Sequence, residues 1–338
     1  MYKKTVIHVF TNNCCNVKFN PNDTSSYWGL GDLIRGSIKL YQYSQIMRFN
    51  YYVDINLHPI SKYLVNSTHP YTQLVQDNKD NIKYYYIDTL KPFFKKNNKK
   101  KSNFTNIIEK NNNDQDLENP ERKNQDQDQD DDLENPERKN QDDDLEIFEC
   151  ENQDDDDYEE VIMLTTNDKI AETLPITDDC KKFILKIFTP KPEFKLYFNN
   201  YVNEILKLTS DYGICHFRFG DDLLIKYETK MSNFESFLNK YIINNYISIK
   251  TDILLTDNKL FKKYVLDNNY MISPDTIIKH LGSDEDEDED YGTRDTLVDF
   301  FLILNSKIIK SYTVYSWISG FVFWASVLKD IPLIILDK

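Results

Sequence analysis

The segment from Asp211 to Asp222 carries the side chains best suited to chemistry, because an imidazole and a guanidinium follow one another on an apolar strand. Period-two alternation along Tyr212–Phe219 places His216 and Arg218 on one face of this predicted strand. Arg218 then lies at the carboxyl end, the edge where open α/β sheets bind ligands. Its planar fork of donors matches a phosphate or diphosphate. The segment therefore predicts an anion-binding site, with Asp221 close enough in sequence to brace the guanidinium.

Each of these side chains also has a purely structural explanation. A histidine on a strand face is more often a core residue than a catalytic group. Arg218 can instead pair with Asp221 or Asp222 inside the fold. Asp257 can cap the helix expected at 259–266, or it can contact a nucleoside or ribose. The residues alone leave these alternatives open.

Strands and helices alternate on both sides of a long polar tract. In the N-terminal part, apolar residues predict strands at 5–10, 51–55 and 84–87. A helix follows Gly29 and Gly31, with Asp32 at its N-cap, and ends near residue 49. The C-terminal part predicts strands at 212–219, 252–256, 308–311 and 331–336, and helices near 194–208, 234–242, 259–266, 297–304 and 321–328. This alternation predicts doubly wound parallel sheets.

The two glycines before the first helix have two explanations. They let backbone amides approach an anion at a helix N-terminus, or they merely allow a tight turn from strand to helix. The spacing is not that of a full dinucleotide fingerprint. Both explanations stay open.

Composition divides the chain into two α/β domains and an insertion. We expect an N-terminal Rossmann-like domain at 1–95, a disordered acidic low-complexity linker at 96–160, and a C-terminal Rossmann-like domain at 161–338. A second acidic loop, at 284–290, interrupts the last of these. Without residues 110–160 and 284–290, which carry net charges of −18 and −7, the formal charge of −15 becomes about +10, which suits an anionic ligand such as a nucleotide diphosphate.

Other functional classes find little support in the sequence. Nucleic-acid binding is not expected, because a Lys/Arg-rich run occurs only at 95–101. The five histidines show no metal-ligand spacing. An EF-hand-like series beginning at Asp126 lacks the glycine that its turn needs, and no G-x-S-x-G elbow of a hydrolase occurs.

Cysteine usage and hydropathy bear on the compartment. The five cysteines form no C-x-x-C pair, and we expect free thiols in a reducing compartment. No apolar run is long enough to span a membrane. A cytosolic protein is therefore expected, in the host cytosol if the Asn/Ile/Lys-rich composition reflects a viral genome.

Three segments together resemble the fucosyltransferase superfamily. Residues 216–221, His-Phe-Arg-Phe-Gly-Asp, are similar to its H-x-R-x-G-D motif. Residues 28–36 resemble its first glycine-rich loop, and residues 313–318, Thr-Val-Tyr-Ser-Trp-Ile, resemble its S-T-F-S-W-W element. A weaker match is 254–258, in the place of a strand ending in S-D-D. The likeness covers most of 1–95 and 161–338, in the family's order.

This resemblance implies a GT-B-like fold, in which two Rossmann-type domains face each other, and an inverting, metal-independent transfer of fucose from GDP-fucose to a glycan or other hydroxyl acceptor. Arg218 would hold the β-phosphate, while His216 and Asp221 position it. No cofactor is implied besides the donor substrate, and the N-terminal domain would lie on the acceptor side. The further residues implied to bind the nucleotide sugar are Gly29, Gly31, Asp32, Arg35, Asp257, Ser316, Trp317 and Ser319.

The chain departs from the family pattern at two places. Phe219 stands where many members carry a second arginine, so Arg218 alone can be carried over as a diphosphate ligand. Residues 319–326 also fit a variant of the last element, which leaves the choice between Ser316 and Ser319 open. From the residues alone, Trp317 is expected to pack in the core rather than to form a platform for a sugar. Two other functions remain: a GT-B transferase that uses another nucleotide sugar, and an inactive transferase fold that acts as a binding protein.

Overall fold

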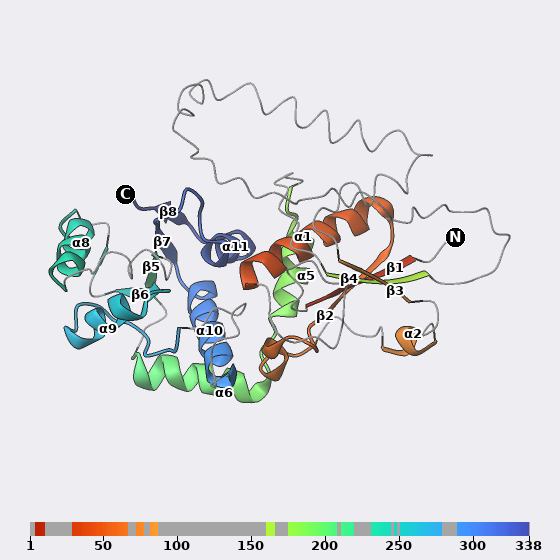
Figure 1. Ribbon diagram of the computed structural model, residues 1–338, viewed down its shortest axis with the longest axis horizontal. Helices are drawn as coiled ribbons and strands as arrows, with labels where there is room; N and C mark the ends of the chain where they lie inside the picture. Colours follow the sequence, from red (N-terminus) through yellow and green to blue (C-terminus); the bar gives the residue numbers. More distant parts are fainter. Residues whose placement is uncertain are drawn as a thin grey trace, which may run out of the picture. The chain divides into compact units, whose positions relative to one another are not determined.

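The computed structural model contains two four-stranded parallel sheets and the helices that cover them (Figure 1). Both sheets belong to one compact unit, residues 1–89 and 157–338. The structure describes residues 4–10, 29–66, 72–77, 82–86, 160–165, 175–207, 211–219, 231–244, 247–248, 251–278 and 289–337. Most of the acidic linker and of the acidic loop at 284–290 lies outside these ranges.

The N-terminal sheet has the order β2-β1-β4-β3. Its strands are β1 (Lys4–Val9), β2 (Asn50–Asp54), β3 (Lys83–Tyr86) and β4 (Glu160–Thr165). Every pairing between them is parallel. On one face, Ile7 and Val9 pack with Val75 of the short helix α2 (Thr72–Asp77). On the other, the Nδ1 atom of His8 lies 3.0 Å from the Oγ atom of Ser37 in α1 (Leu30–Met47). Helices therefore cover both faces.

The position of β4 differs from the domain boundary that the sequence predicts. Residues 161–338 are expected to form the C-terminal domain, yet β4 pairs with β1 and β3 of the N-terminal sheet. Its apolar residues Val161–Leu164 are buried. A continuous apolar run indicates burial on both faces of a sheet and carries no information about which strands lie beside it. The acidic tract thus interrupts the N-terminal sheet in sequence.

Helix α1 begins one turn earlier than predicted. Gly29, in an extended conformation, is its N-cap, and the N–H of Asp32 donates to the Gly29 carbonyl at 3.0 Å. Asp32 therefore lies within the first turn and not at the N-cap. There its carboxylate binds Arg35 one turn later, with 2.7 Å between Oδ1 and Nη2. A carboxylate in the first turn is also favoured by the helix dipole.

Among the described residues between β4 and the C-terminal sheet, three segments are helical. Helix α5 (Asp178–Ile187) is capped by the side chain of Thr177, which accepts from the N–H of Cys180 at 3.2 Å. Helix α6 (Pro192–Asn200) continues into one π-helical turn, η3 (Tyr201–Ile205). The single helix predicted near 194–208 is therefore present, with a change of helix type inside it.

The C-terminal sheet has the order β6-β5-β7-β8 and is also parallel. Its strands are β5 (Gly213–Arg218), β6 (Asp252–Thr256), β7 (Ile308–Thr313) and β8 (Leu333–Ile335). The helices between them are α8 (Met231–Ile243), α9 (Lys259–Asp267), α10 (Glu289–Leu304) and α11 (Gly320–Lys329). The predicted alternation of strand and helix is confirmed in this part of the chain.

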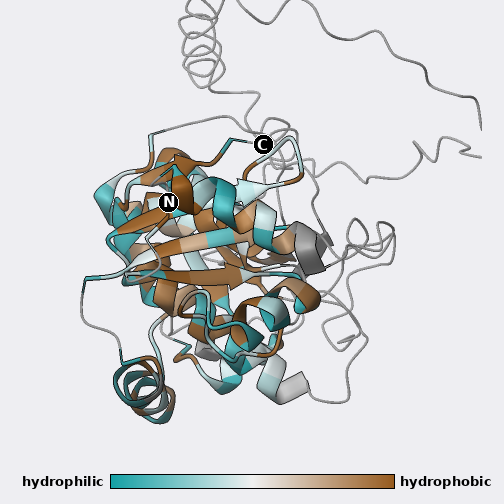
Figure 2. Cartoon of the chain, turned by 90° about the vertical axis from the view of Figure 1, so that its left-hand side faces the viewer, coloured by the Kyte–Doolittle hydropathy of each residue, from teal (hydrophilic) through white to brown (hydrophobic). Residues whose placement is uncertain are grey.

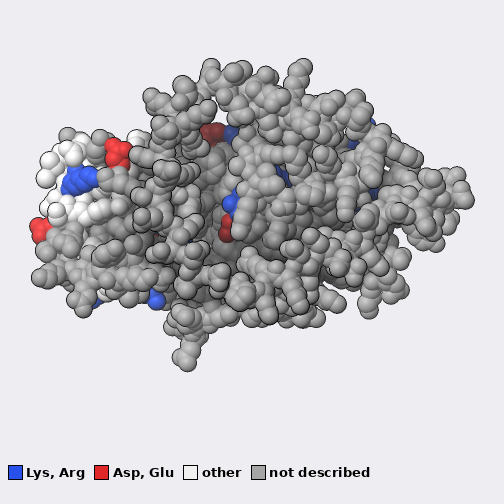
Figure 3. All heavy atoms as spheres, turned by 45° about the horizontal axis from the view of Figure 1, so that its top comes forward, with Lys and Arg blue, Asp and Glu red and all other residues white. Residues whose placement is uncertain are grey.

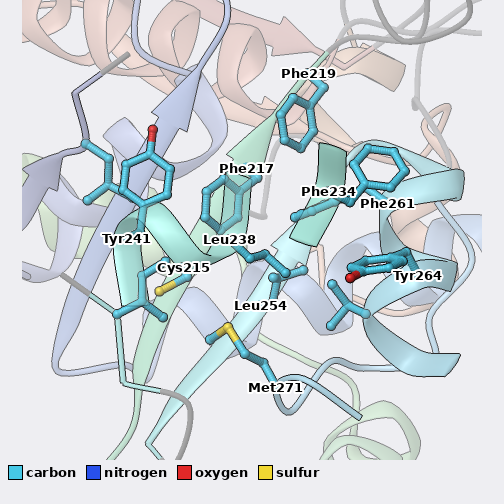
Figure 4. Packing of buried hydrophobic residues seen from close by; sticks show 13 residues of the cluster. Cys215, Phe217, Phe219, Phe234, Leu238, Tyr241, Leu254, Phe261, Tyr264 and Met271 are labelled. Carbon is cyan, nitrogen blue, oxygen red and sulfur yellow. The ribbon is translucent and has the colours of Figure 1, made fainter. Parts of the chain in front are cut away.

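The two faces of β5 are buried in different ways. Cys215, Phe217 and Phe219 point into an aromatic core with Phe234 of α8 and Phe261 of α9 (Figure 4). Side chains at the alternate positions face the helices on the other side of the sheet, and the ring of His216 lies 6.5 Å from that of Phe321 in α11. The strands are strongly hydrophobic and the helices carry hydrophilic residues (Figure 2). This is the doubly wound arrangement that the sequence predicts.

Helices α1 and α11 pack against each other at their N-terminal ends. A Cβ atom added to Gly31 would lie 2.8 Å from the carbonyl carbon of Gly320 and 3.0 Å from its Cα atom. Only glycine fits at such a close approach of two backbones. Gly31 therefore lets the first helix of the N-terminal sheet contact the last helix of the C-terminal sheet.

Candidate functional site

Three strand ends meet at the carboxyl edge of the C-terminal sheet. Arg218 is the last residue of β5, Asp257 directly follows β6, and Thr313 ends β7. Arg218 pairs in register with Thr313, and the N–H of Val314 continues the ladder to the Arg218 carbonyl at 3.1 Å. The polar side chains at this edge are thus placed by three parallel strands, which is the usual position of a ligand site in α/β folds.

Arg218 forms an ion pair with Asp257 that the sequence does not predict. Its Nη1 atom lies 3.2 Å from Oδ2 of Asp257. The other carboxylate oxygen accepts the backbone N–H of Phe219 at 2.8 Å. The predicted partners Asp221 and Asp222 lie outside the described residues. A usable signal was present, since Asp257 directly follows the strand predicted at 252–256.

Asp257 does not cap the next helix, contrary to one of the two sequence-based explanations. Asn258 does so instead, because its side chain accepts the N–H of Phe261 at 2.8 Å. The carboxylate of Asp257 is thereby directed toward β5 and Arg218. Contact of Asp257 with a nucleoside stays a prediction.

The guanidinium of Arg218 remains accessible beside this carboxylate. The side chain is 26% exposed, and its ion pair uses Nη1 of a group that carries five N–H donors. Its central carbon lies 5.9 Å from the centre of the Tyr315 ring. Within the part of the chain that the structure describes, the pair fixes Arg218 in place and leaves donors for a second anion.

His216 is buried on the strand face that it shares with Arg218. Burial lowers its pKa to about 4; the charge of Asp257 opposes this shift and that of Arg218 adds to it. Among the described residues, its Nδ1 atom has no hydrogen-bond partner, and neither has the Oγ atom of Ser311, its in-register neighbour on β7. The imidazole is thus neutral at pH 7 and has an unsatisfied nitrogen.

The segment between β7 and α11 contains the two candidate serines and Trp317. Ser319 is buried and is the residue that precedes α11, whereas Ser316 is exposed in the turn. Trp317 is 62% exposed, so the expectation that it packs in the core is wrong. Its ring stacks on that of Tyr315, with 4.8 Å between centroids and 17° between planes. The apolar character of a tryptophan predicts burial on average and cannot show a turn that holds it in solvent.

A polar cluster that the sequence does not predict as a site lies under α10. The Nζ atom of Lys262 donates to the carbonyl and hydroxyl of Thr276, and this hydroxyl donates to Oδ1 of Asp299 at 3.1 Å. Burial raises the pKa of Asp299 to about 6. Asp295, one turn earlier, accepts the N–H of Ile277 at 2.8 Å. The available signal was Asp299, a carboxylate inside the apolar run 297–304, with Asp295 one helical turn before it.

Two features are absent from the residues that the structure describes. No helix among them is long and apolar enough to cross a membrane, and no group of three or more His, Cys, Asp or Glu side chains is placed to hold a metal ion. On the face drawn in Figure 3, the visible charged atoms of described residues include basic and acidic groups side by side.

Comparison with known proteins shows similarity at the level of structure. No protein-family model and no curated protein sequence matches the chain. NodZ alpha-1,6-fucosyltransferase co-crystallized with GDP aligns with all of this chain and 96% of its own, at 10% identity and a TM-score of 0.50. The selenomethionine form of fucosyltransferase NodZ from Bradyrhizobium gives the same values. A FUT1 mutant of Arabidopsis thaliana in complex with GDP aligns with 100% of this chain and 71% of its own, at 9% identity and a TM-score of 0.48.

A structural similarity at such low sequence identity establishes the fold and not the activity. The predicted fold class is confirmed, with two doubly wound parallel sheets of four strands each. The similarity in fold to NodZ is measured over the full length of this chain. The chain has the GT-B-like α/β fold seen in the fucosyltransferase NodZ.

Proposed function

We propose that this protein is a glycosyltransferase that moves fucose from GDP-fucose to a hydroxyl group of a glycan or another acceptor. The observation that carries the proposal is the accessible guanidinium of Arg218, held by Asp257 at the carboxyl edge of the C-terminal sheet. The NodZ structure with the same fold was co-crystallized with GDP, which supports a guanosine diphosphate donor here.

In this proposal Arg218 binds the β-phosphate of the donor. As the bond between the sugar and the phosphate oxygen breaks, negative charge accumulates on GDP, and a fixed guanidinium stabilises that charge more in the transition state than in the ground state. The acceptor oxygen forms the new bond from the opposite side of the sugar and gives up its proton to solvent, which inverts the anomeric centre. Asp257 holds the guanidinium in place through the 3.2 Å ion pair.

The remaining residues act as positioning groups. Neutral His216 lies on the same strand face as Arg218 and, with Asp221, is proposed to orient it. Ser319, or Ser316 in the preceding turn, is proposed to contact phosphate; Ser319 is the better placed of the two because it precedes α11, whose N-terminal amides suit an anion. Gly29, Gly31, Asp32 and Arg35 are proposed to line the facing N-terminal domain. Because Arg218 supplies the countercharge, we expect transfer to be unchanged in excess chelator.

Titration of the full chain with GDP, UDP and ADP tests the proposal directly. We expect GDP to bind more tightly than the other two, and labelled GDP-fucose to release GDP when a hydroxyl acceptor is present. Preferential binding of UDP or ADP would indicate a transferase for another nucleotide sugar. If the protein binds none of the three nucleotides, an enzymatic role is contradicted and an inactive fold that acts as a binding protein is favoured.

A further inference from the structure

The turn that follows β7 carries two stacked aromatic rings, and the outer one faces solvent. The ring of Tyr315 is half-buried, and the indole of Trp317 stacks on it at 4.8 Å. An indole is among the largest apolar groups in proteins, and shielding it from water is favourable. The indole of Trp317 stacks on Tyr315 with one face and is largely exposed. It is therefore available to stack on a flat group of a ligand.

Backbone contacts hold these rings relative to Arg218. The N–H of Tyr315 donates to Oγ1 of Thr313 at 3.2 Å, which tightens the turn directly after β7. The N–H of Val314 donates to the carbonyl of Arg218 itself. The guanidinium carbon then lies 5.9 Å from the Tyr315 ring centre. The platform formed by Tyr315 and Trp317 is therefore built onto the end of β5 through the sheet ladder.

The order of groups along the sheet edge decides which part of the substrates this platform meets. The strand order β6-β5-β7 places Asp257, Arg218 and then the aromatic pair along the carboxyl edge. A carboxylate accepts hydrogen bonds from the N–H and O–H donors of a nucleoside. The faces of the two stacked rings carry no such acceptor. If Arg218 holds the diphosphate, the nucleoside extends toward Asp257, and the sugar and its acceptor lie on the other side.

We propose that Trp317 is the stacking platform for a pyranose ring of a carbohydrate acceptor, an inference that rests on the proposed transferase function. One face of a pyranose presents several C–H bonds with weakly positive hydrogens, and this face complements the negative face of an indole. Tyr315 supports the indole from behind. The platform selects acceptors that contain a sugar ring over acyclic hydroxyl compounds.

Binding to the platform can be measured without any transfer. The chain has three tryptophans, so incorporation of 5-fluorotryptophan gives three fluorine signals, and Trp317→Phe identifies the one of interest by its loss. With GDP present, we expect methyl pyranosides of galactose, glucose or N-acetylglucosamine to shift the Trp317 signal, and galactitol at the same concentration to leave it in place. Equal shifts with galactitol, or none with any pyranoside, would overturn the proposal, whether or not the protein proves to be a fucosyltransferase.

A transfer assay adds the second readout. With the pyranoside that shifts the signal as acceptor, we expect Trp317→Ala to raise the acceptor KM about tenfold, a loss of roughly 1.4 kcal/mol, while the Kd for GDP is unchanged. Trp317→Phe should retain most of the affinity. Ile243→Ala, which removes an exposed apolar side chain from α8, is the matched control and should change neither value. A weaker GDP affinity with an unchanged acceptor KM would assign the platform to the nucleobase instead.

Discussion

Two ion pairs bridge strands at opposite ends of the C-terminal sheet, one between the neighbours β5 and β6 and one between β7 and β6, across β5. At the amino ends, Lys310 of β7 lies 2.6 Å from Asp252, the first residue of β6. At the carboxyl ends, Arg218 of β5 lies 3.2 Å from Asp257, directly after β6. In both pairs the aspartate belongs to β6 or directly follows it, and the basic residue comes from another strand. The surroundings of the two pairs differ.

The pair at the amino ends is closed by protein groups. Oδ2 of Asp252 also accepts the N–H of Ser248 at 2.7 Å and lies 3.6 Å from Sγ of Cys215, and the Lys310 side chain is only 14% exposed. The pair at the carboxyl ends has an accessible guanidinium beside an exposed aromatic stack. The hydrogen bonds to Asp252 and the low exposure of Lys310 indicate a structural role for the first pair. The accessible guanidinium at a strand end indicates a ligand site for the second.

The largest effect is expected at the closed pair. Lys310→Met removes the cation and leaves Asp252 buried with its charge, so the free energy of unfolding should fall by about 3–5 kcal/mol. The affinity for GDP, measured below the unfolding temperature, should not change. Denaturant unfolding and nucleotide titration of the same variant check this. Weakened GDP binding in a folded variant would mean that the two ends of the sheet do not separate stability from function.

The next effect is the reverse of the first and concerns the open pair. Arg218→Ala removes a charge-assisted contact that strengthens as GDP leaves, so transfer should fall by at least about a hundredfold. Arg218→Lys should restore little, because a point charge cannot reproduce the planar fork.

Stability provides the control for this pair. Arg218 and Asp257 are more exposed than Lys310 and Asp252, at 26% and 9% against 14% and 3%, so water compensates Asp257 better when Arg218 is removed, and unfolding should be affected less than in Lys310→Met. A strongly destabilised Arg218→Ala variant that binds GDP normally would contradict the proposed role and leave a structural ion pair.

The contrast between the two pairs also shows what the sequence can predict. The period-two pattern of β5 correctly separated the face of Phe217 from the face of His216, because one-sided burial imposes that alternation. The ion pairs could not be predicted in the same way. They depend on which strands become neighbours and in what register, and the partners lie 39 and 58 residues apart.

The same reasoning applies to the misplaced elements. The assignment of β4 to the C-terminal domain failed because strand pairing across the acidic tract leaves no local pattern. The burial of Trp317 was mispredicted because exposure there depends on the turn that Thr313 fixes. Element types followed from local periodicity, whereas the sheet that a strand joins and the surroundings of Arg218 followed from tertiary pairing.

A smaller effect is expected where the two sheets are linked through α1 and α11. Gly31→Ala adds a methyl group 2.8 Å from the Gly320 carbonyl carbon, and relieving such an overlap with backbone costs roughly 1–3 kcal/mol. Gly29→Ser is the matched control, because the nearest atom to a Cβ there is 3.9 Å away and serine suits an N-cap.

Thermal unfolding and GDP titration of both glycine variants separate the two explanations for these glycines. A drop in Tm for Gly31→Ala alone supports close helix packing. If both variants keep the Tm of the unmodified protein but bind GDP more weakly, an anion site at the start of α1 is supported instead.

The smallest effect concerns pH and sets the open end of the sheet against the cluster under α10. His216 has a pKa lowered from 6.5 to about 4 by burial. Between these values the unfolded chain binds a proton that the folded chain does not, so the stability contributed by neutral His216 is full above pH 6.5 and is lost as the pH falls toward 4. We expect the Tm of His216→Gln to fall less than that of the unmodified protein between pH 7 and pH 4.5.

Asp299 supplies a control of opposite sign. Burial raises its pKa from 3.8 to about 6, so its protonated form stabilises the fold below pH 3.8, and this contribution is lost as the pH rises through 6. Relative to the unmodified protein, Asp299→Asn should therefore gain stability as the pH rises from 4.5 to 7, whereas His216→Gln should lose it. Parallel pH dependences in both variants would show that the acid sensitivity is a general property of the fold. Opposite slopes would place a neutral, buried imidazole next to Arg218, as the proposed positioning of the guanidinium requires.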